Sequence, residues 1–221
     1  MMRDEYAWTD ETAIDDFLNE METGVLGTID EDGWPHCVPV NYIWHGGSVY
    51  FHCGPGSKLD NLRREPKVSF TVVEALSVVT SEFSSSPCRN TQLGRSVVIK
   101  GLAGEVRSPE QKQLMLNKLI GKYDPQAVHR PESEKMTLES LTDLPGFSQC
   151  RVVKIETREF RARLDLLQNK PEKYLKTMAA HFQKLAHEEG RERDAKTALL
   201  INQLFLQSGH RPFTPTKGPI E

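Results

Sequence analysis

The residues best suited to chemistry lie in a glycine-rich turn, Gly54 to Lys58, followed by the short helical pattern LDNLRR, which stops at Pro66. Backbone N–H groups at such a helix start have no partners and can bind an anion. We expect Ser57 to be the N-cap, because serine is a preferred residue there. Lys58 adds a positive charge, and Asn61 follows on the first turn. The pattern predicts a phosphate site, but an ordinary capped connector helix has the same pattern.

Two β-hairpins are predicted before this turn. Their turns are expected at Asp30 to Gly33 and at Gly46-Gly47, because Asp-Gly and Gly-Gly pairs between alternating apolar runs are typical of hairpins. A Gly46-Gly47 loop places Asn41 opposite His52, Tyr42 opposite Phe51 and Trp44 opposite Val49. Since side chains alternate across a strand, one face is apolar and is expected in the core. It consists of Val38, Val40, Tyr42, Trp44, Val49, Phe51 and Cys53.

The opposite face of the second hairpin carries Pro39, Asn41, Tyr50 and His52. These residues are too polar for a core, so the face is suited to a bound ligand. A metal is not expected, because His36-Cys37 and His52-Cys53 each direct their two side chains to opposite faces, whereas a tetrahedral site needs four converging ligands. We therefore expect buried, inert cysteines in these two pairs.

Several motifs in the same order resemble a known family. They are GxPxxVPVNY from Gly33, YFHC from Tyr50, GxGSKLxNLRxxPxVSF from Gly54 and RSVxxxGxA from Arg95. This run resembles the FMN-binding split β-barrel of the pyridoxamine 5'-phosphate oxidase-like superfamily, and most of all the branch with the 5-nitroimidazole-resistance proteins. The resemblance covers roughly residues 10 to 160, and the ordered set of motifs makes it specific.

The resemblance implies an α+β fold, an FMN-binding split β-barrel, mostly antiparallel, with flanking helices and a C-terminal helical extension. It also implies a homodimer with an FMN at each end of the interface. Ser57 and Lys58 are expected to bind the phosphate with support from Asn61, and Arg63 and Arg64 are weaker candidates. The backbone from Val38 to Asn41 is expected to border the flavin ring. The cofactor-binding set is Val38, Pro39, Val40, Asn41, Phe51, His52, Ser57, Lys58, Asn61, Arg95, Ser96 and Val97.

Composition narrows the classes of partner. The net charge is −3 and the isoelectric point is near 6.2, so a nucleic-acid partner is not expected. No apolar run approaches the roughly 20 residues that span a membrane, and the acidic N-terminal stretch lacks the apolar segment of a signal peptide. Four cysteines without a C-x-x-C spacing favour reduced thiols, and we expect a cytoplasmic protein.

The rest of the chain predicts helices and strands without regular βαβ alternation. Helices are expected after Thr9 or Asp10 and from Pro109, and strands over residues 67–73, 95–106 and 149–160. The strand over 95–106 is expected to be broken at Gly101 and Gly104, by a bulge or a close approach of the backbone. Residues 76–90 lose periodicity, which predicts a long loop or a flap, and residues 124–146 predict a loop with one short helix. We divide the chain into a barrel domain, 1–165, and a helical extension with a polar tail, 166–221. Two amphipathic helices are expected in the extension at 171–189, with Leu175, Met178, Phe182 and Leu185, and at 191–207, with Ala198, Leu199, Asn202, Phe205 and Leu206.

These expectations favour a small FMN-dependent oxidoreductase that acts on an unknown small molecule or electron acceptor. Oxidation of pyridoxamine phosphate itself is not expected, because the ending HRPF does not match the Arg-, Trp- and Pro-rich segment of the true oxidases. Two alternatives remain open. One is a non-catalytic module that binds flavin, or haem through His52 or His36; the other is a dimeric scaffold that acts through its C-terminal helices.

Overall fold

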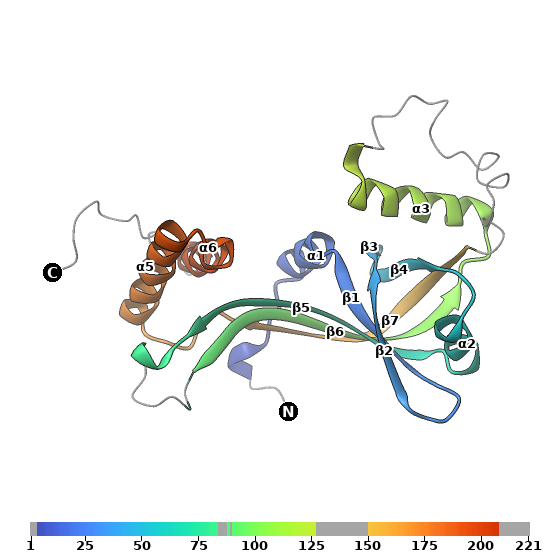
Figure 1. Ribbon diagram of the computed structural model, residues 1–221, viewed down its shortest axis with the longest axis horizontal. Helices are drawn as coiled ribbons and strands as arrows, with labels where there is room; N and C mark the ends of the chain where they lie inside the picture. The colour runs from blue at the N-terminus through green and yellow to red at the C-terminus, as the bar shows by residue number, and fades with distance from the viewer. Residues whose placement is uncertain (1–3, 84–87, 89, 127–149, 208–221) are drawn as a thin grey trace. The chain divides into compact units, whose positions relative to one another are not determined.

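Helices and strands follow one another along the chain without a regular alternation (Figure 1). The computed structural model describes residues 4–83, 88, 90–126 and 150–207. The helices in this part are η1 (Asp4–Tyr6), α1 (Glu11–Glu20), α2 (Ser57–Arg64), η2 (Ser81–Phe83), α3 (Pro109–Tyr123), α5 (Glu172–Glu189) and α6 (Glu192–Gln207). The strands are β1 (Thr23–Ile29), β2 (Pro35–Asn41), β3 (Ile43–His45), β4 (Ser48–Cys53), β5 (Lys67–Val79), β6 (Thr91–Glu105) and β7 (Arg151–Asp165).

The strands form one seven-stranded sheet in the order β2-β1-β5-β6-β7-β4-β3. The pairs β1–β2, β1–β5, β3–β4 and β4–β7 are all antiparallel. Antiparallel strands with helices outside the sheet, and no βαβ alternation, make this an α+β fold of the split-barrel type, as predicted.

The chain divides into two compact units that do not follow its order. The barrel unit consists of Thr9–Val72 and Val97–Ala162, and the helical unit consists of Met1–Trp8, Val73–Ser96 and Arg163–Glu221. Strands β5, β6 and β7 each continue from one unit into the other. The division after residue 165 stays a prediction.

Both predicted hairpins are present in the barrel unit. In the first, Leu26 pairs with Val38, and the Asp30 carboxylate accepts hydrogen bonds from the N–H groups of Asp32 and Trp34 in the turn. In the second, Trp44 pairs with Val49, as the Gly46-Gly47 turn predicted. The predicted core face is confirmed for Val40, Tyr42, Val49, Phe51 and Cys53, which are buried, whereas Val38 and Trp44 are only partly buried.

Tyr50 is a correction to the expected ligand-binding face. Its side chain is only 5% exposed and packs against Met115, Leu116 and Leu119 of α3. Helix α3 lies over β3 and β4 (Figure 1). It begins at Pro109, as predicted, and the structure adds Ser108 as its N-cap. The hairpin pattern alone could not show which of its faces a later helix covers.

Strands β5 and β6 are longer than the sequence predicted. The expectation of a loop from residue 76 was wrong for Leu76 to Val79, because Leu76 and Val79 are buried in the core of the helical unit. Strand β6 begins at Thr91 and continues through Gly101 and Gly104 without a break. A Cβ at Gly101 would lie 2.5 Å from the Glu156 backbone oxygen, so the predicted close approach is confirmed at Gly101, whereas a Cβ at Gly104 would meet no atom within 4 Å. Residues 84–87 and 89, and the loop and short helix predicted within 124–146 beyond residue 126, lie outside the described residues.

The helical unit has its own apolar core. Helices α5 and α6 lie side by side (Figure 1), and the buried face of α5 includes Leu175, Met178 and Phe182, as predicted. The α6 pattern was partly wrong: Leu199 is 57% exposed, while Ala198 and Ile201 are buried. Residues of other elements of the same chain complete the core around α5 and α6. They are Leu76 and Val79 of β5, Leu93 of β6, and Leu166 and Leu167 just after β7.

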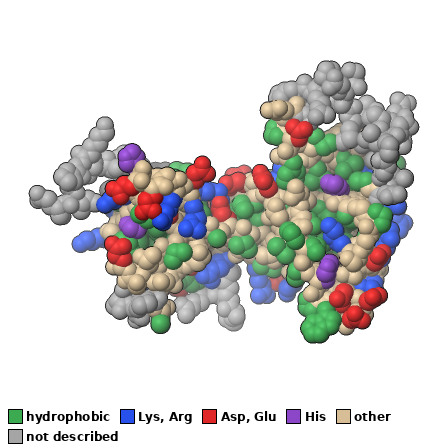
Figure 2. All heavy atoms as spheres, in the orientation of Figure 1, with side chains coloured by type: hydrophobic (Ala, Val, Ile, Leu, Met, Phe, Trp, Pro, Cys, Tyr) green, Lys and Arg blue, Asp and Glu red, His purple; other side chains and the backbone are tan. Residues whose placement is uncertain are grey.

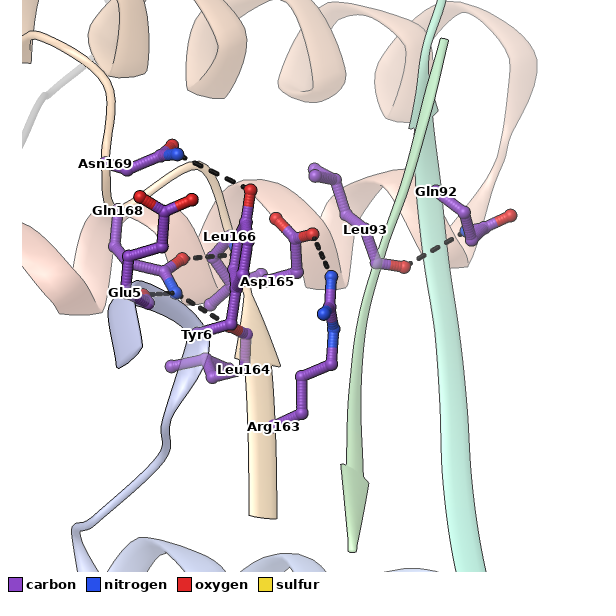
Figure 3. A network of polar contacts seen from close by, with 10 residues as sticks. All are labelled: Glu5, Tyr6, Gln92, Leu93, Arg163, Leu164, Asp165, Leu166, Gln168 and Asn169. Carbon is purple, nitrogen blue, oxygen red and sulfur yellow. Dashed lines mark hydrogen bonds and ion pairs between the residues drawn. The ribbon is translucent and has the colours of Figure 1, made fainter. Parts of the chain in front are cut away.

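Polar contacts join the N-terminal segment to the end of β7 within this unit (Figure 3). The Gln168 amide donates to the backbone oxygens of Glu5, at 2.9 Å, and Leu164, at 2.7 Å. The Arg163 guanidinium lies 4.3 Å from the centre of the Tyr6 ring and pairs with Asp165 at 2.9 Å. The first residues of the chain therefore belong structurally with its last strand.

Candidate functional site

The glycine-rich turn and α2 form the first part of the site. Gly56, not Ser57, is the N-cap: its carbonyl accepts from the N–H groups of Leu59, at 2.9 Å, and Asp60, at 3.1 Å. Its φ of 145° is a conformation that residues with a side chain rarely adopt, which explains why the cap falls on the glycine. Ser57 is the first residue of the helix, and its side chain is exposed.

This turn is open and rich in unpaired donors. Within the described part of the chain, the N–H groups of Ser57 and Lys58 donate to no other backbone group. A Cβ at Gly54 or Gly56 would meet no atom within 4 Å, so a ligand can approach the backbone. The Lys58 ammonium lies 5.7 Å from the centre of the Phe51 ring on β4. Unpaired N–H groups, the helix dipole and one ammonium together favour an anion.

Both the nitrogen and the oxygen of the Asn61 side-chain amide form hydrogen bonds within the protein. It is buried, its Nδ2 donates to Thr28 Oγ1 at 3.1 Å, and its Oδ1 accepts from Arg64 at 2.8 Å. The Thr28 hydroxyl in turn donates to the His36 backbone oxygen at 3.2 Å. Asn61 thus fastens α2 to the β1–β2 hairpin, and its contact with a phosphate stays a prediction.

Strands β2 and β4 form the second part of the site. Strand β2 is at one end of the sheet, so one edge of its backbone has no partner strand among the described residues. Pro39, Asn41 and His52 are exposed. Asn41 pairs with Thr23 of β1 and the β3–β4 register begins at Ile43, so the predicted pairs Asn41–His52 and Tyr42–Phe51 are not part of that ladder. Val40 and Phe51 are buried, which leaves them only backbone groups to offer a ligand, and Val38 is partly buried.

The RSV motif lies where the two units meet along β6. Arg95 and Ser96 belong to the helical unit and Val97 to the barrel unit, where Val97 is fully buried. Arg95 is also buried and is paired with Glu74 of β5 at 2.5 Å, and Lys196 of α6 contacts the same carboxylate. Arg95 is therefore held by its own unit, and the flavin contacts expected of Arg95, Ser96 and Val97 stay predictions.

Sequence reasoning missed the role of Lys122 and Tyr123 at the end of α3. The Tyr123 hydroxyl accepts from the Tyr42 N–H at 2.8 Å and shares its proton between the carbonyl oxygens of Tyr42, at 2.8 Å, and Glu22. Lys122 donates to the Met21 carbonyl at 2.7 Å, with its ammonium 4.3 Å from the centre of the Tyr42 ring. From the sequence, Tyr123 is only one of several apolar residues at helical spacing after Pro109, and nothing in that pattern indicates these hydrogen bonds.

Burial shifts the pKa values of this group. It lowers the pKa of Lys122 to about 8, an effect that the nearby Glu22 partly opposes. It raises the pKa values of the Tyr42 and Tyr123 hydroxyls, so both are protonated near neutrality. Because Tyr42 directly follows Asn41, these contacts fix the backbone at the end of the strand that is expected to border a ligand.

The cysteines differ from the expectation in one respect. Cys53 is buried, and burial raises the pKa of its thiol, whereas Cys37 is exposed because it lies on the outer face of β2. In the described part of the chain no three His, Cys, Asp or Glu side chains are grouped as metal ligands. The helices described also include none long and apolar enough to cross a membrane.

The fold is similar to several solved structures. A conserved hypothetical protein from Mycobacterium tuberculosis is 24% identical, with 78% of this chain and 94% of that one covered and a TM-score of 0.60. The flavocytochrome Anf3 of Azotobacter vinelandii is 18% identical over 72% of this chain and 69% of that one, with a TM-score of 0.59. A Bacteroides thetaiotaomicron protein named for 5-nitroimidazole antibiotic resistance is 18% identical over 71% and 85%, with a TM-score of 0.55.

At these identities the solved structures establish the fold alone, and no curated protein matches the chain. The sequence model described as pyridoxamine 5'-phosphate oxidase matches residues 10–159, which include every motif on which the resemblance depended. The resemblance is therefore confirmed over most of the chain. The chain belongs to the pyridoxamine 5'-phosphate oxidase family.

Proposed function

We propose that this chain binds FMN and acts as a small flavin-dependent oxidoreductase. The observation that carries the proposal is the open turn at Gly54–Ser57, with unpaired N–H groups on Ser57 and Lys58. Family membership supports it, and so does the similarity to a protein that is a flavocytochrome by name.

The residues present fit the two ends of the cofactor. The turn has room and donors for a phosphate, and Lys58 supplies a charge beside it. The exposed edge of β2 offers backbone groups to the rim of a flavin ring, with Asn41 exposed at the end of β2 and His52 exposed on β4. When bound, FMN supplies two-electron exchange with a substrate, and the protein holds and orients it. A nitroaromatic or another small oxidised compound is the class of acceptor that we propose.

We propose further that a second copy of the chain covers the outer face of the β1–β2 hairpin. Val25 is 42% exposed and pairs with Pro39, while Ile29 is 39% exposed and pairs with Pro35, so the four side chains share one face. Trp34, at 71%, extends this apolar surface at the turn. Figure 2 shows hydrophobic side chains at the surface beside a group of acidic ones, where Figure 1 has this turn. Continuous exposed apolar surface of this kind often marks a protein interface.

The visible absorption spectrum of the purified protein tests the proposal. We expect two flavin bands, release of a compound with the mass of FMN on heating, and a light-scattering mass of two chains. A Soret band instead would assign the protein to the haem-binding alternative. A colourless protein that also fails to bind added FMN would overturn the proposed function.

A Lys58→Ala variant tests the phosphate contact. Losing a hydrogen bond to a charged group costs about 1.5–3 kcal/mol, so the FMN dissociation constant should rise roughly 10- to 100-fold. Lys67→Ala is the matched control, because Lys67 is another lysine of the barrel unit but is exposed on β5, away from the turn in the sequence. Equal FMN affinity in the two variants would remove Lys58 from the site.

A further inference from the structure

The barrel unit contains a cavity that is lined by residues of α2, β6, α3 and β7. Its volume is about 950 Å³, within the usual size range for small-molecule sites. Leu59, Leu62 and Arg63 line it, and these positions share one face of α2 because they are three and four residues apart. No member of the predicted cofactor-binding set lines this cavity, but Arg63, one of the two weaker phosphate candidates, does. Its apolar wall is formed by Leu59, Leu62, Ala103, Val106, Val152 and Val153.

The polar part of the lining is strongly basic. Among the described residues of the lining, Arg63, Arg107, Lys112 and Arg151 contribute four cations and Glu105 one carboxylate. This surplus of three positive charges lies in a chain whose net charge is −3, so the basic residues are concentrated here against the overall balance. A concave surface lined by one sign of charge concentrates ligands of the other sign.

Glu105 holds two of the arginines in place. Its Oε1 accepts from Arg63 Nε at 2.9 Å and Nη2 at 2.8 Å, and its Oε2 lies 3.3 Å from Arg151 Nε. All three side chains are 30–53% exposed, so they remain accessible from solvent. Guanidinium groups that a carboxylate already orients lose less side-chain freedom when they bind a further anion.

We propose that this cavity binds a small amphipathic carboxylate, with its apolar body against the α2, β6 and β7 residues and its carboxylate at the arginines. The apolar wall and the cationic lining must both be used for such a ligand to bind well. A purely apolar molecule makes no contact that uses the charge of the basic lining, and a small inorganic anion leaves the apolar wall in contact with water. The proposal does not depend on flavin binding.

Three probes separate the contribution of apolar contact from that of charge in the wild-type protein. They are octanoate, 1-octanol and acetate, each titrated by calorimetry at low salt. Octanoate should bind at least tenfold more tightly than either of the other two. Its affinity should fall as ionic strength rises, because the charge contribution is screened. Comparable affinity for octanoate and octanol, or no octanoate binding at millimolar concentration, would overturn the proposal.

Variants then locate the binding. Arg151→Gln removes one cation, and Gly104→Phe fills the cavity from a position where a Cβ meets no atom within 4 Å. Each should weaken octanoate binding at least tenfold. Arg161→Gln is the matched control, since Arg161 also lies on β7, pairs with Glu159 at 2.8 Å and does not line the cavity. Unchanged octanoate affinity in both test variants, with native circular dichroism, would place the binding elsewhere and refute the assignment.

Repeating the octanoate titration with FMN present distinguishes this site from the proposed flavin site. We expect less than a twofold change in octanoate affinity. Loss of octanoate binding on adding FMN would show that the cavity belongs to the flavin site and would overturn the proposal of a separate one. Octanoate binding by a protein that binds no FMN would reject the proposed function while supporting this cavity.

Discussion

Replacing Tyr123 with phenylalanine removes one hydroxyl that satisfies two backbone groups of Tyr42. The chain changes partner strand at this point: β2 ends at Asn41, paired with Thr23 of β1, and β3 begins at Ile43, paired with Tyr50 of β4. Between them Tyr42 has no ladder partner, and both its N–H and its C=O bond to the Tyr123 hydroxyl at 2.8 Å. The hydroxyl therefore replaces a neighbouring strand at the corner.

The cost follows from leaving these groups unpaired. The Tyr42 side chain is fully buried, and an unsatisfied buried backbone group costs about 1–3 kcal/mol. Tyr123 itself is only partly buried, so water can satisfy part of the loss. We expect Tyr123→Phe to lower the free energy of unfolding by about 2–4 kcal/mol.

Urea unfolding followed by circular dichroism, at one protein concentration and without added flavin, measures this difference. Tyr50→Phe is the matched control, because Tyr50 belongs to the same apolar cluster, and its hydroxyl makes no hydrogen bond to the described residues. That control should change the unfolding free energy by less than about 0.5–1 kcal/mol. An equal effect of the two substitutions would refute the role assigned to the Tyr123 hydroxyl.

Two further predictions concern other contacts of the barrel unit. The pKa of Lys122 is about 8 in the folded protein against an ordinary 10.5, so between these values the unfolded chain binds more protons and stability rises with pH. The unfolding free energy of the wild type minus that of Lys122→Met should therefore increase between about pH 7.5 and 9.5; a flat difference would contradict the shifted pKa. Gly101→Ala should lower the free energy of unfolding by about 1–3 kcal/mol or more, because the new Cβ would lie 2.5 Å from the Glu156 oxygen and 2.6 Å from Ile155 Cγ2. Gly104→Ala is the control, because a Cβ there would meet no atom within 4 Å. Equal melting temperatures of these two glycine variants would show that β6 and β7 do not approach closely at Gly101.

Local patterns in the sequence were sufficient to predict the hairpin turns, the helix starts and the family. The Asp-Gly and Gly-Gly turns, the start of α3 at Pro109 and the Asp10 N-cap, which accepts from Ala13, depend on residues a few positions apart. The ordered motifs identified the family for the same reason, since each is a short contiguous stretch. The location of the candidate anion site at the glycine-rich turn also followed from the sequence, although its cap residue did not.

Only the tertiary structure decided which side chains far apart in the sequence contact one another. Asn61 bonds to Thr28, 33 residues away, and Tyr123 bonds to Tyr42, 81 residues away. Tyr50 is covered by a helix that begins at Pro109, and the cavity beside α2 combines residues of α2, β6, α3 and β7. Hydrophobic periodicity reports that a face is buried, but not what buries it. Partners of buried polar groups are therefore determined when the strands and helices pack together.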